Sequence, residues 1–264
     1  MTDTLEAWFA RWGLEPDGAA FAGSEGRLAP VRFKRRPAML KVFGSADEAR
    51  GGRVLDWWGG RGAVEVLASA PEAVLMVRAP AAAGLAQMAE AGEDDQASAI
   101  LCQVVAALHA PRPCPEPAGV PPLRGLFAKL VGVAQDDARL AAAAATAARL
   151  LETQQEVVVL HADIHHFNVL DFGGGDRRAI DPWGYRGERA YDYANIVRNP
   201  SLDLVRAPGR LERQLEIIAA AARLELSRLR SWVFAHAGLA AVWDLEDGHD
   251  PSRSFAVLDR LAGA

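Results

Sequence analysis

The amino-acid sequence predicts an α+β fold of two lobes, a small mixed N-terminal lobe and a mostly helical C-terminal lobe. Strand-like apolar runs and one helical segment occupy the first 78 residues. Residues 123–154 are rich in Ala and Leu and contain no proline, and the chain is helical in pattern after Pro200. We therefore expect one lobe over residues 1–78 and a second over residues 79–264.

The N-terminal lobe is expected to open with a short amphipathic helix over residues 2–13, whose apolar side chains recur on one side. Strand-like runs follow at residues 39–43 and 74–77. The glycine-containing stretch 21–27 is typical of a turn between the first two strands. Such a turn could lie over phosphate groups through its backbone, although an ordinary hairpin turn explains two glycines equally well.

Lys41 is the one charged residue within the strand-like run 39–43. A lysine flanked by buried positions is costly unless an acid or a phosphate pairs with it. Lys41 is therefore a candidate contact for nucleotide phosphates, and an edge-strand lysine that points to water is the alternative. Ser45, followed three residues later by Glu48, forms a capping-box pattern and opens a helix through Trp58.

The C-terminal lobe is expected to begin with a helix over residues 94–110. Residues 111–122 contain six prolines and predict a rigid connecting loop. Residues 123–154 should form one long helix or two. The chain after Pro200 should form roughly three further helical pieces.

Three polar residues, Asp163, Asn168 and Asp181, are spaced by five and thirteen positions and follow or separate short apolar runs. A strand over residues 157–160 precedes Asp163, and a second strand starts directly after Asn168. The glycine-rich stretch 173–176 then turns the chain, and the returning strand delivers Asp181. All three side chains are therefore expected at the ends of paired strands, aimed at one point.

This set of side chains is the one that kinase phosphoryl transfer requires. One Asp accepts or orients the proton of the attacking hydroxyl, while an Asn and a second Asp hold the magnesium ions on the nucleotide phosphates. We therefore assign Asp163 as the catalytic base and Asn168 and Asp181 as metal ligands. A buried His and Asp that are only hydrogen-bonded core groups would be the alternative for His161 and Asp163.

A second candidate metal ligand lies close by. Asp171-Phe172-Gly173 spells the D-F-G triplet of protein kinases, but it follows Asn168 by only three residues. That spacing leaves no room for the hairpin that separates the two metal ligands. Asp171 is therefore expected at a strand end or turn, and Asp181 remains the predicted ligand.

The stretch from His161 to Pro200 resembles the aminoglycoside phosphotransferases, and most closely the streptomycin 6-kinase and hydroxyurea phosphotransferase branch. The resemblance rests on the doubled histidine after Asp163, on the sequence Ile-Asp-Pro, and on the trailing pattern G-x-R-x-x-D-Y-A-N-I-x-x-N-P. One departure is Ala162, where relatives have glycine. Because alanine disfavours unusual backbone angles, we expect this position to keep an ordinary backbone conformation.

The resemblance implies a protein-kinase-like fold, with ATP and Mg²⁺ in the cleft between the lobes. It also implies that Lys41 contacts the phosphates and pairs with a helix glutamate, a place that Glu48 could fill, although Glu48 could equally be only the acid of the cap. Met76 and Arg78 would lie at the adenine, at the end of the last strand and in the hinge. Relatives tend to carry Glu at the position of Arg78, so its main chain is expected to meet the base.

The resemblance further implies a small-molecule hydroxyl as acceptor, cationic and most simply an aminoglycoside such as streptomycin. Carboxylates that recognise such a cation should lack salt bridges of their own. The best candidate is the stretch Trp243-Asp244-Leu245-Glu246-Asp247, which offers carboxylates and an aromatic face, and a solvated helix end is the alternative for it. Two other functions stay open: a kinase of another amino alcohol or sugar, and a pseudokinase that binds nucleotide as a scaffold.

Composition limits the other possibilities. The 264 residues have a formal net charge of −5, which disfavours binding to nucleic acid through a basic face. Two cysteines cannot build a disulfide framework and suggest a reducing compartment. No segment is long and apolar enough to span a membrane, so we expect a cytoplasmic protein. The sequence leaves its oligomeric state open.

Overall fold

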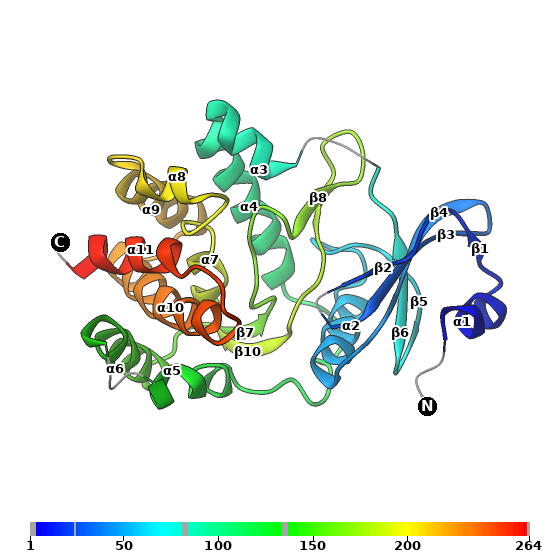
Figure 1. Ribbon diagram of the computed structural model, residues 1–264, viewed down its shortest axis with the longest axis horizontal. Coiled ribbons are helices and arrows are strands. Elements are labelled where there is room, and N and C mark those ends of the chain that lie inside the picture. Colours follow the sequence, from blue (N-terminus) through cyan, green and yellow to red (C-terminus); the bar gives the residue numbers. More distant parts are fainter. Residues whose placement is uncertain (1–3, 24, 81–83, 134–136, 263–264) are drawn as a thin grey trace.

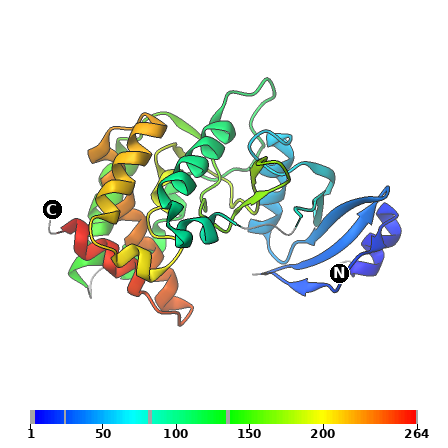
Figure 2. The same ribbon diagram turned by 90° about the horizontal axis from the view of Figure 1, so that it is seen from above.

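The computed structural model describes residues 4–23, 25–80, 84–133 and 137–262. It consists of two lobes, a sheet with two helices at the N-terminal side and a larger helical lobe (Figures 1 and 2). The predicted two-lobed α+β fold is thus confirmed. None of the helices within the described ranges is long and apolar enough to cross a membrane.

The N-terminal lobe is built on a six-stranded sheet with the order β1-β3-β4-β6-β5, to which β2 adds by pairing with β3. Every pairing in it is antiparallel. Leu28, Lys41 and Val74 are paired across the three central strands. The strands are β1 (Glu15–Pro16), β2 (Phe21–Ala22), β3 (Arg27–Phe33), β4 (Arg36–Val42), β5 (Val66–Ala70) and β6 (Ala73–Val77).

Two helices cover opposite faces of this sheet. Helix α1 (Leu5–Trp12) packs its buried Trp8 against a cluster that includes Leu40. Helix α2 (Ala46–Trp58) lies on the other face, and its N-cap Ser45 accepts a hydrogen bond from the backbone N–H of Glu48, as the capping pattern predicts. Because successive strand residues point to opposite faces, Lys41 points to the α2 side.

The C-terminal lobe contains two small hairpins and a helical body. Strand β7 (Val157–Leu160) pairs with β10 (Tyr185–Glu188), and β8 (Val169–Asp171) pairs with β9 (Arg177–Ala179). The β8–β9 hairpin also contacts the N-terminal lobe, because the backbone of Ala179 exchanges hydrogen bonds with Gly62 and Val64 at 2.8 and 2.9 Å. Figure 1 shows β8 between the helical body and the sheet.

The helical body agrees with most of the expectations. The predicted helix 94–110 is α4, and residues 123–154 form two α-helices, with residues 134–136 outside the described part. Four helices, rather than three, follow Pro200, because Pro208-Gly209 separates a short α8 from α9. The elements are α3 (Leu85–Met88), η1 (Ala89–Glu93), α4 (Asp94–His109), η2 (Leu123–Gly125), α5 (Ala128–Val133), α6 (Ala138–Glu152), α7 (Tyr191–Ala194), α8 (Leu202–Arg206), α9 (Arg210–Ala222), α10 (Leu226–Glu246) and α11 (Ser252–Ala262).

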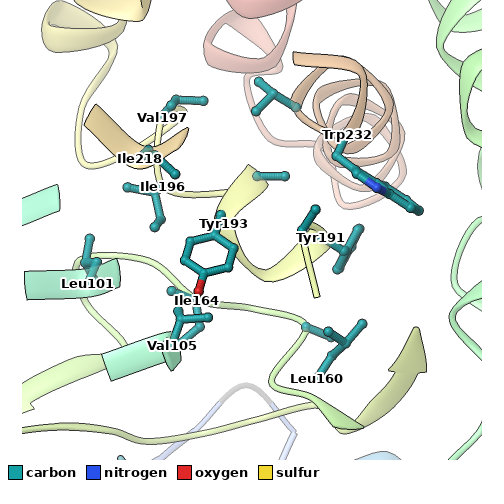
Figure 3. Packing of buried hydrophobic residues seen from close by; sticks show 14 of the residues in the cluster. Leu101, Val105, Leu160, Ile164, Tyr191, Tyr193, Ile196, Val197, Ile218 and Trp232 are labelled. Atoms are coloured by element: carbon teal, nitrogen blue, oxygen red, sulfur yellow. The ribbon is translucent and has the colours of Figure 1, made fainter. Parts of the chain in front are cut away.

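The core of this lobe surrounds the short helix α7. Tyr191 and Tyr193 are both 1% exposed and belong to the main hydrophobic cluster. Figure 3 shows Tyr193 facing Ile164 of the predicted catalytic loop (residues 161–168) and Tyr191 on the side of Trp232 in α10. The ring of Tyr191 meets the ring of Trp232 edge to face, with centroids 5.6 Å apart. Helix α7 is thereby fixed directly behind the catalytic loop.

A buried ion pair joins α4 to α9. Arg210, 3% exposed, donates from Nε and Nη2 to the two carboxylate oxygens of Asp94 at 2.7 and 2.9 Å. The same guanidinium also donates to the carbonyl oxygens of Val197 and Asn199, both at 2.8 Å. Arg210 therefore anchors the segment that follows α7, and with it the back of the catalytic loop.

Replacement of Arg210 by Met should lower the free energy of unfolding by about 3–5 kcal/mol, because Asp94 is left buried without its partner. The matched control is Arg260→Met, whose ion pair with Glu212 is 39% and 42% exposed and should change stability by less than about 1 kcal/mol. Chemical denaturation of both variants measures the difference. Equal, small losses would contradict the structural importance of the buried pair.

Candidate active site

A buried lysine joins the two lobes. Lys41 on β4 is 7% exposed, and its Nζ lies 2.5 Å from Oδ1 of Asp181 and 2.8 Å from Oε1 of Glu48. Burial alone would lower the pKa of the Lys41 ammonium, but the two carboxylates outweigh it and the pKa is raised. Lys41 is therefore a fixed positive charge, and an edge-strand lysine pointing to water is excluded.

The structure shows that Glu48 is more than the acid of the cap, because its carboxylate pairs with the strand lysine. One oxygen pairs with Lys41, and the other accepts a hydrogen bond from the backbone N–H of Gly44 at 2.7 Å. The N-terminal turn of α2 thus holds the carboxylate that orients the lysine.

The predicted turn over residues 21–27 is a hairpin turn between β2 and β3. It is closed by a hydrogen bond from Gly23 N to Gly26 O, and Ser24 lies outside the described residues.

Asp163 is held by a ring of donors. Nδ2 of Asn168 donates to its carbonyl oxygen and to Oδ2, at 2.9 and 3.1 Å. Nδ2 of Asn195 in the segment after α7 donates to Oδ1 at 3.1 Å, and Nε2 of His165 lies 3.5 Å from Oδ2. The Asp163 side chain is 24% exposed. The carboxylate is therefore fixed in one orientation and still reachable from outside.

His161 brings the segments of Asp163 and Asp181 side by side. Its Nε2 donates to the carbonyl oxygen of Ile180 at 2.8 Å, and its Nδ1 accepts from the backbone N–H of Asp163 at 3.2 Å. Its own carbonyl oxygen accepts from the N–H of Trp183 at 2.9 Å. Burial lowers the pKa of His161. Both ring nitrogens are occupied by backbone partners, so His161 braces the loop.

Asp192 braces the same loop from behind, as the sequence suggests. Its carboxylate accepts from the backbone N–H groups of His161 and Ala162 at 2.9 and 2.7 Å, and it contacts Nε2 of His109 at 2.8 Å. These bonds hold Ala162 at φ 70°, in the left-handed region. The expectation of an ordinary backbone at Ala162 is therefore wrong, because two short bonds to one carboxylate outweigh the strain of a Cβ there.

The remaining histidine and the D-F-G triplet lie off the reaction path. His166 is 1% exposed, and burial lowers its pKa to about 4, so it is neutral and turned into the core.

Asp171, the first residue of the D-F-G triplet, ends strand β8. It accepts a hydrogen bond from Gly173 N at 2.8 Å and pairs with Arg177 at 3.3 Å. The prediction that Asp171 closes a turn is confirmed, and Asp181 is the carboxylate that reaches Lys41.

An apolar cavity of about 310 Å³ opens between the sheet and the β8–β9 hairpin. Lys41, Glu48 and Asp181 lie on its wall, and Met76 belongs to its lining together with the main chain of the hinge. Apolar side chains from both lobes complete it, a composition that suits a flat nucleobase. They are Phe21, Leu28, Met39, Val74, Leu170, Phe172 and Ile180.

Arg78 also borders this cavity, but its side chain has another partner. Its guanidinium pairs with the carboxylate of Asp17, and its Nη1 donates to the Asp17 carbonyl oxygen at 3.3 Å. The hydrogen bond from Arg78 holds the pKa of Asp17 below its usual value. The side chain is thus tied to the loop between β1 and β2, which leaves only the main chain of Arg78 toward a base.

The predicted cation-recognition stretch 243–247 divides into two parts. Glu246 and Asp247 are exposed at the end of α10, where Glu246 pairs with Lys129 at 2.6 Å, so the interpretation of a solvated helix end holds for them. Asp244 is 16% exposed, and its Oδ2 accepts from Nη1 of Arg198 at 3.4 Å and from Oγ of Ser254 at 3.1 Å. It is therefore neither a solvated helix end nor an unpaired carboxylate. Trp243 packs edge to face on Trp183, with ring centroids 5.0 Å apart.

A magnesium ion fits the donors that are present. Mg²⁺ takes oxygen ligands, usually one or two protein groups completed by substrate phosphates and water. Asp181 supplies a carboxylate whose side chain is 50% exposed, and Asn168 supplies an amide oxygen. The bond from Ile180 N to Asn168 O, 2.9 Å, keeps these residues adjacent. Within the described ranges no group of three His, Cys, Asp or Glu side chains is placed to hold a metal ion.

Comparison with known proteins identifies the family. Residues 11–248 match the family model described as aminoglycoside/hydroxyurea antibiotic resistance kinase. The chain belongs to this family. The kinase is 47% identical to the streptomycin 3''-kinase of Klebsiella pneumoniae, over 90% of this chain and 91% of that protein. The streptomycin 6-kinase of Streptomyces griseus is 28% identical, over 96% and 86% of the two chains.

Solved structures confirm the kinase-like fold. The aminoglycoside phosphotransferase APH(4)-Ia in complex with ADP and hygromycin B superposes with a TM-score of 0.67 at 19% identity, covering 97% of this chain and 96% of that one. The choline kinase LicA of Streptococcus pneumoniae gives 0.60 at 14% identity, over 95% and 93%. The kinase is thus a phosphotransferase of small molecules with a hydroxyl acceptor, as the sequence predicts.

Sequence reasoning missed two residues that the structure brings to Asp163. Asn195 contacts its carboxylate, and Arg198 contacts Asn195, with Nε 3.3 Å from Oδ1. Both lie in the pattern D-Y-A-N-I-x-x-N-P that supports the family resemblance. Asn195 and Arg198 are three residues apart, a spacing that places two side chains on the same side of a helical turn. This spacing was the sequence signal that could have indicated their contact.

Replacement of Ala162 by Gly should change the free energy of unfolding by less than about 1 kcal/mol, since relief of left-handed strain offsets the flexibility gained by the unfolded chain. The control is Ala143→Gly, fully buried in α6, which should lose about 2 kcal/mol from helix propensity and a lost methyl contact. Chemical denaturation gives both values. Equal losses would show that Ala162 is not left-handed.

Proposed function

We propose that this kinase transfers the γ-phosphate of ATP to a hydroxyl of streptomycin and thereby inactivates the antibiotic. The observation that carries the proposal is the pairing of Lys41 with Asp181 on the wall of an apolar cavity, together with His161, which hydrogen-bonds both to Ile180 beside Asp181 and to Asp163. Residues 1–78 would form the nucleotide-binding lobe, and residues 79–264 would form the lobe with the catalytic loop and acceptor site. Because ATP is the donor, we propose the cytoplasm as the compartment.

In the proposed reaction the acceptor hydroxyl oxygen attacks the γ-phosphorus of ATP, and the bond from that phosphorus to the β-phosphate oxygen breaks to release ADP. Asp163 orients the hydroxyl and takes its proton. Its carboxylate is suited to this role because Asn168 and Asn195 hold it in one orientation. Lys41 would place its charge on the phosphates, as Glu48 and Asp181 already fix its ammonium.

The adenine is proposed to occupy the apolar cavity, beside Met76 and the main chain of Arg78. Asn168 and Asp181 would hold Mg²⁺ through their oxygen atoms. When bound, the ion would neutralise phosphate charge and align the γ-phosphate with the acceptor. The pairing of Arg78 with Asp17 keeps that guanidinium away from the base.

Streptomycin is the proposed acceptor because two lines of support agree. The 47% identical relative is named a streptomycin 3''-kinase, and the family description names aminoglycosides. A polar cavity of about 390 Å³ lies beside α10 and includes Asp244 and Asp250, and such carboxylates suit a substrate with guanidinium groups. The higher identity to the 3''-kinase favours the 3''-hydroxyl over position 6.

Purified protein should convert streptomycin and ATP to a singly phosphorylated product and ADP. A panel that also contains hydroxyurea, hygromycin B, choline and simple sugars tests the acceptor class. Phosphorus-coupled NMR of the product should locate the phosphate at the 3''-hydroxyl. A phosphate at position 6 would overturn the regiochemistry, and activity only on other acceptors would overturn the proposed substrate. Nucleotide binding without transfer to any alcohol would favour a pseudokinase.

Replacement of Asp163 by Asn should abolish most turnover, with a fall on the order of 10²–10⁴, because the positioned base is lost. Binding of Mg·ATP should be unchanged.

Replacement of Asp181 by Ala should instead weaken Mg²⁺-dependent nucleotide binding itself, because the proposed metal ligand, which is also a partner of Lys41, is removed. Asp171→Ala is the matched control and should alter neither quantity by more than about 3-fold, a difference below 1 kcal/mol. Near-normal turnover of Asp163→Asn, or normal titration of Asp181→Ala, would refute the assigned role.

A further inference from the structure

Asn195 has a fixed orientation at the catalytic carboxylate. Its Oδ1 accepts hydrogen bonds from Nδ2 of Asn199 at 3.0 Å and from Nε of Arg198 at 3.3 Å. With donors on that oxygen, the amide nitrogen must point the other way, where it donates to Oδ1 of Asp163 at 3.1 Å. Asn195 is 3% exposed, so few other partners are within reach. Its amide thus transmits any shift of Arg198 to Asp163.

Arg198 in turn lies between Asn195 and the carboxylate of Asp244. Its Nη1 is 3.4 Å from Oδ2 of Asp244 and donates to Oγ of Ser254 at 3.2 Å, while Ser254 donates to the same Asp244 oxygen at 3.1 Å. The two contacts of the guanidinium with Asn195 and Asp244 are both long for charge-assisted hydrogen bonds. The Arg198 guanidinium is therefore shared between Asn195 and Asp244, and neither of these two acceptors binds it tightly.

Asp244 connects this chain of contacts to a place where an acceptor can bind. Besides its pair with Arg198, it lines the polar cavity of about 390 Å³ beside α10. The cavity also includes Asp250, His249 and Arg253. A cationic group that enters it would compete with Arg198 for the Asp244 carboxylate. The guanidinium would then be freed to close on Asn195.

We propose that Asn195 and Arg198 are positioning residues that couple the binding of a cationic acceptor at Asp244 to the orientation of Asp163. The proposal rests on the phosphotransferase function proposed above and adds a reason for acting only when the acceptor is present. Before the acceptor binds, Arg198 is divided between its partners and its bond to Asn195 is long, at 3.3 Å. After it binds, Arg198 strengthens this bond, and Asn195 holds the Asp163 carboxylate more tightly toward the hydroxyl.

A double-mutant cycle on kcat with streptomycin tests the coupling. Asn195→Ala should lower kcat about 10-fold or more, a part of the 10²–10⁴ that a positioned base contributes. Arg198→Met should lower kcat by a smaller factor, and the double variant should be no worse than Asn195→Ala alone. Asp244→Asn should raise KM, because the cation loses its carboxylate partner, and should leave kcat near the wild-type value, because the released Arg198 already closes on Asn195.

The controls separate positioning from folding. The Kd for Mg·ATP, measured on each variant, should stay within about 2-fold of wild type, a difference below 0.5 kcal/mol. Arg213→Met removes an exposed arginine that pairs with Asp95 and should leave kcat and KM unchanged. If Asn195→Ala fails to bind nucleotide, Asn195→Ser serves in its place, because the smaller polar side chain fits the same site but cannot span Asp163 and Arg198.

Two outcomes would overturn the inference alone. If the effects of Asn195→Ala and Arg198→Met multiply while wild-type activity is normal, Arg198 acts independently of Asn195. If Asp244→Asn lowers kcat as far as Asn195→Ala does, release of Arg198 from Asp244 does not favour the catalytic orientation of Asp163. A wild-type protein that phosphorylates no acceptor would instead refute the proposed function, and the inference with it.

Discussion

The buried ammonium of Lys41 is the constraint on which the active-site geometry depends. An isolated charge with 7% exposure would be strongly unfavourable, so its two carboxylate partners must be in place. Glu48 comes from the adjacent helix, but Asp181 is 140 residues away in the sequence. The ion pair therefore requires the β8–β9 hairpin to dock against the sheet. That docking creates the apolar cavity and brings Asp181 beside the loop of Asp163.

Much of this arrangement could be predicted because its signals are local. The apolar run 39–43 indicated the strand that presents Lys41, and Ser45 with Glu48 indicated the start of α2. The spacing of Asp163, Asn168 and Asp181 around a glycine-rich turn indicated the hairpin. In each case the pattern needs only neighbouring residues and the geometry of one element.

The features that could not be predicted depend on contacts distant in the sequence. Ala162 adopts a left-handed conformation because Asp192 binds two successive N–H groups, which no local preference reveals. The side chain of Arg78 turns to Asp17, and Asp244 pairs with Arg198, because the fold places these elements together. Such partners are invisible in a pattern of residue types, since long side chains reach whichever opposite charge the fold brings near.

Both lobes thus contribute charges to one small volume, where a triphosphate would meet an acceptor hydroxyl. A crystal structure of the protein with Mg²⁺ and a non-hydrolysable ATP analogue tests this claim most directly. We expect the base against Met76, the γ-phosphate beside Lys41, and the ion bound by oxygen atoms of Asn168 and Asp181. A nucleotide bound outside this cavity, or an ion that contacts neither residue, would contradict the account.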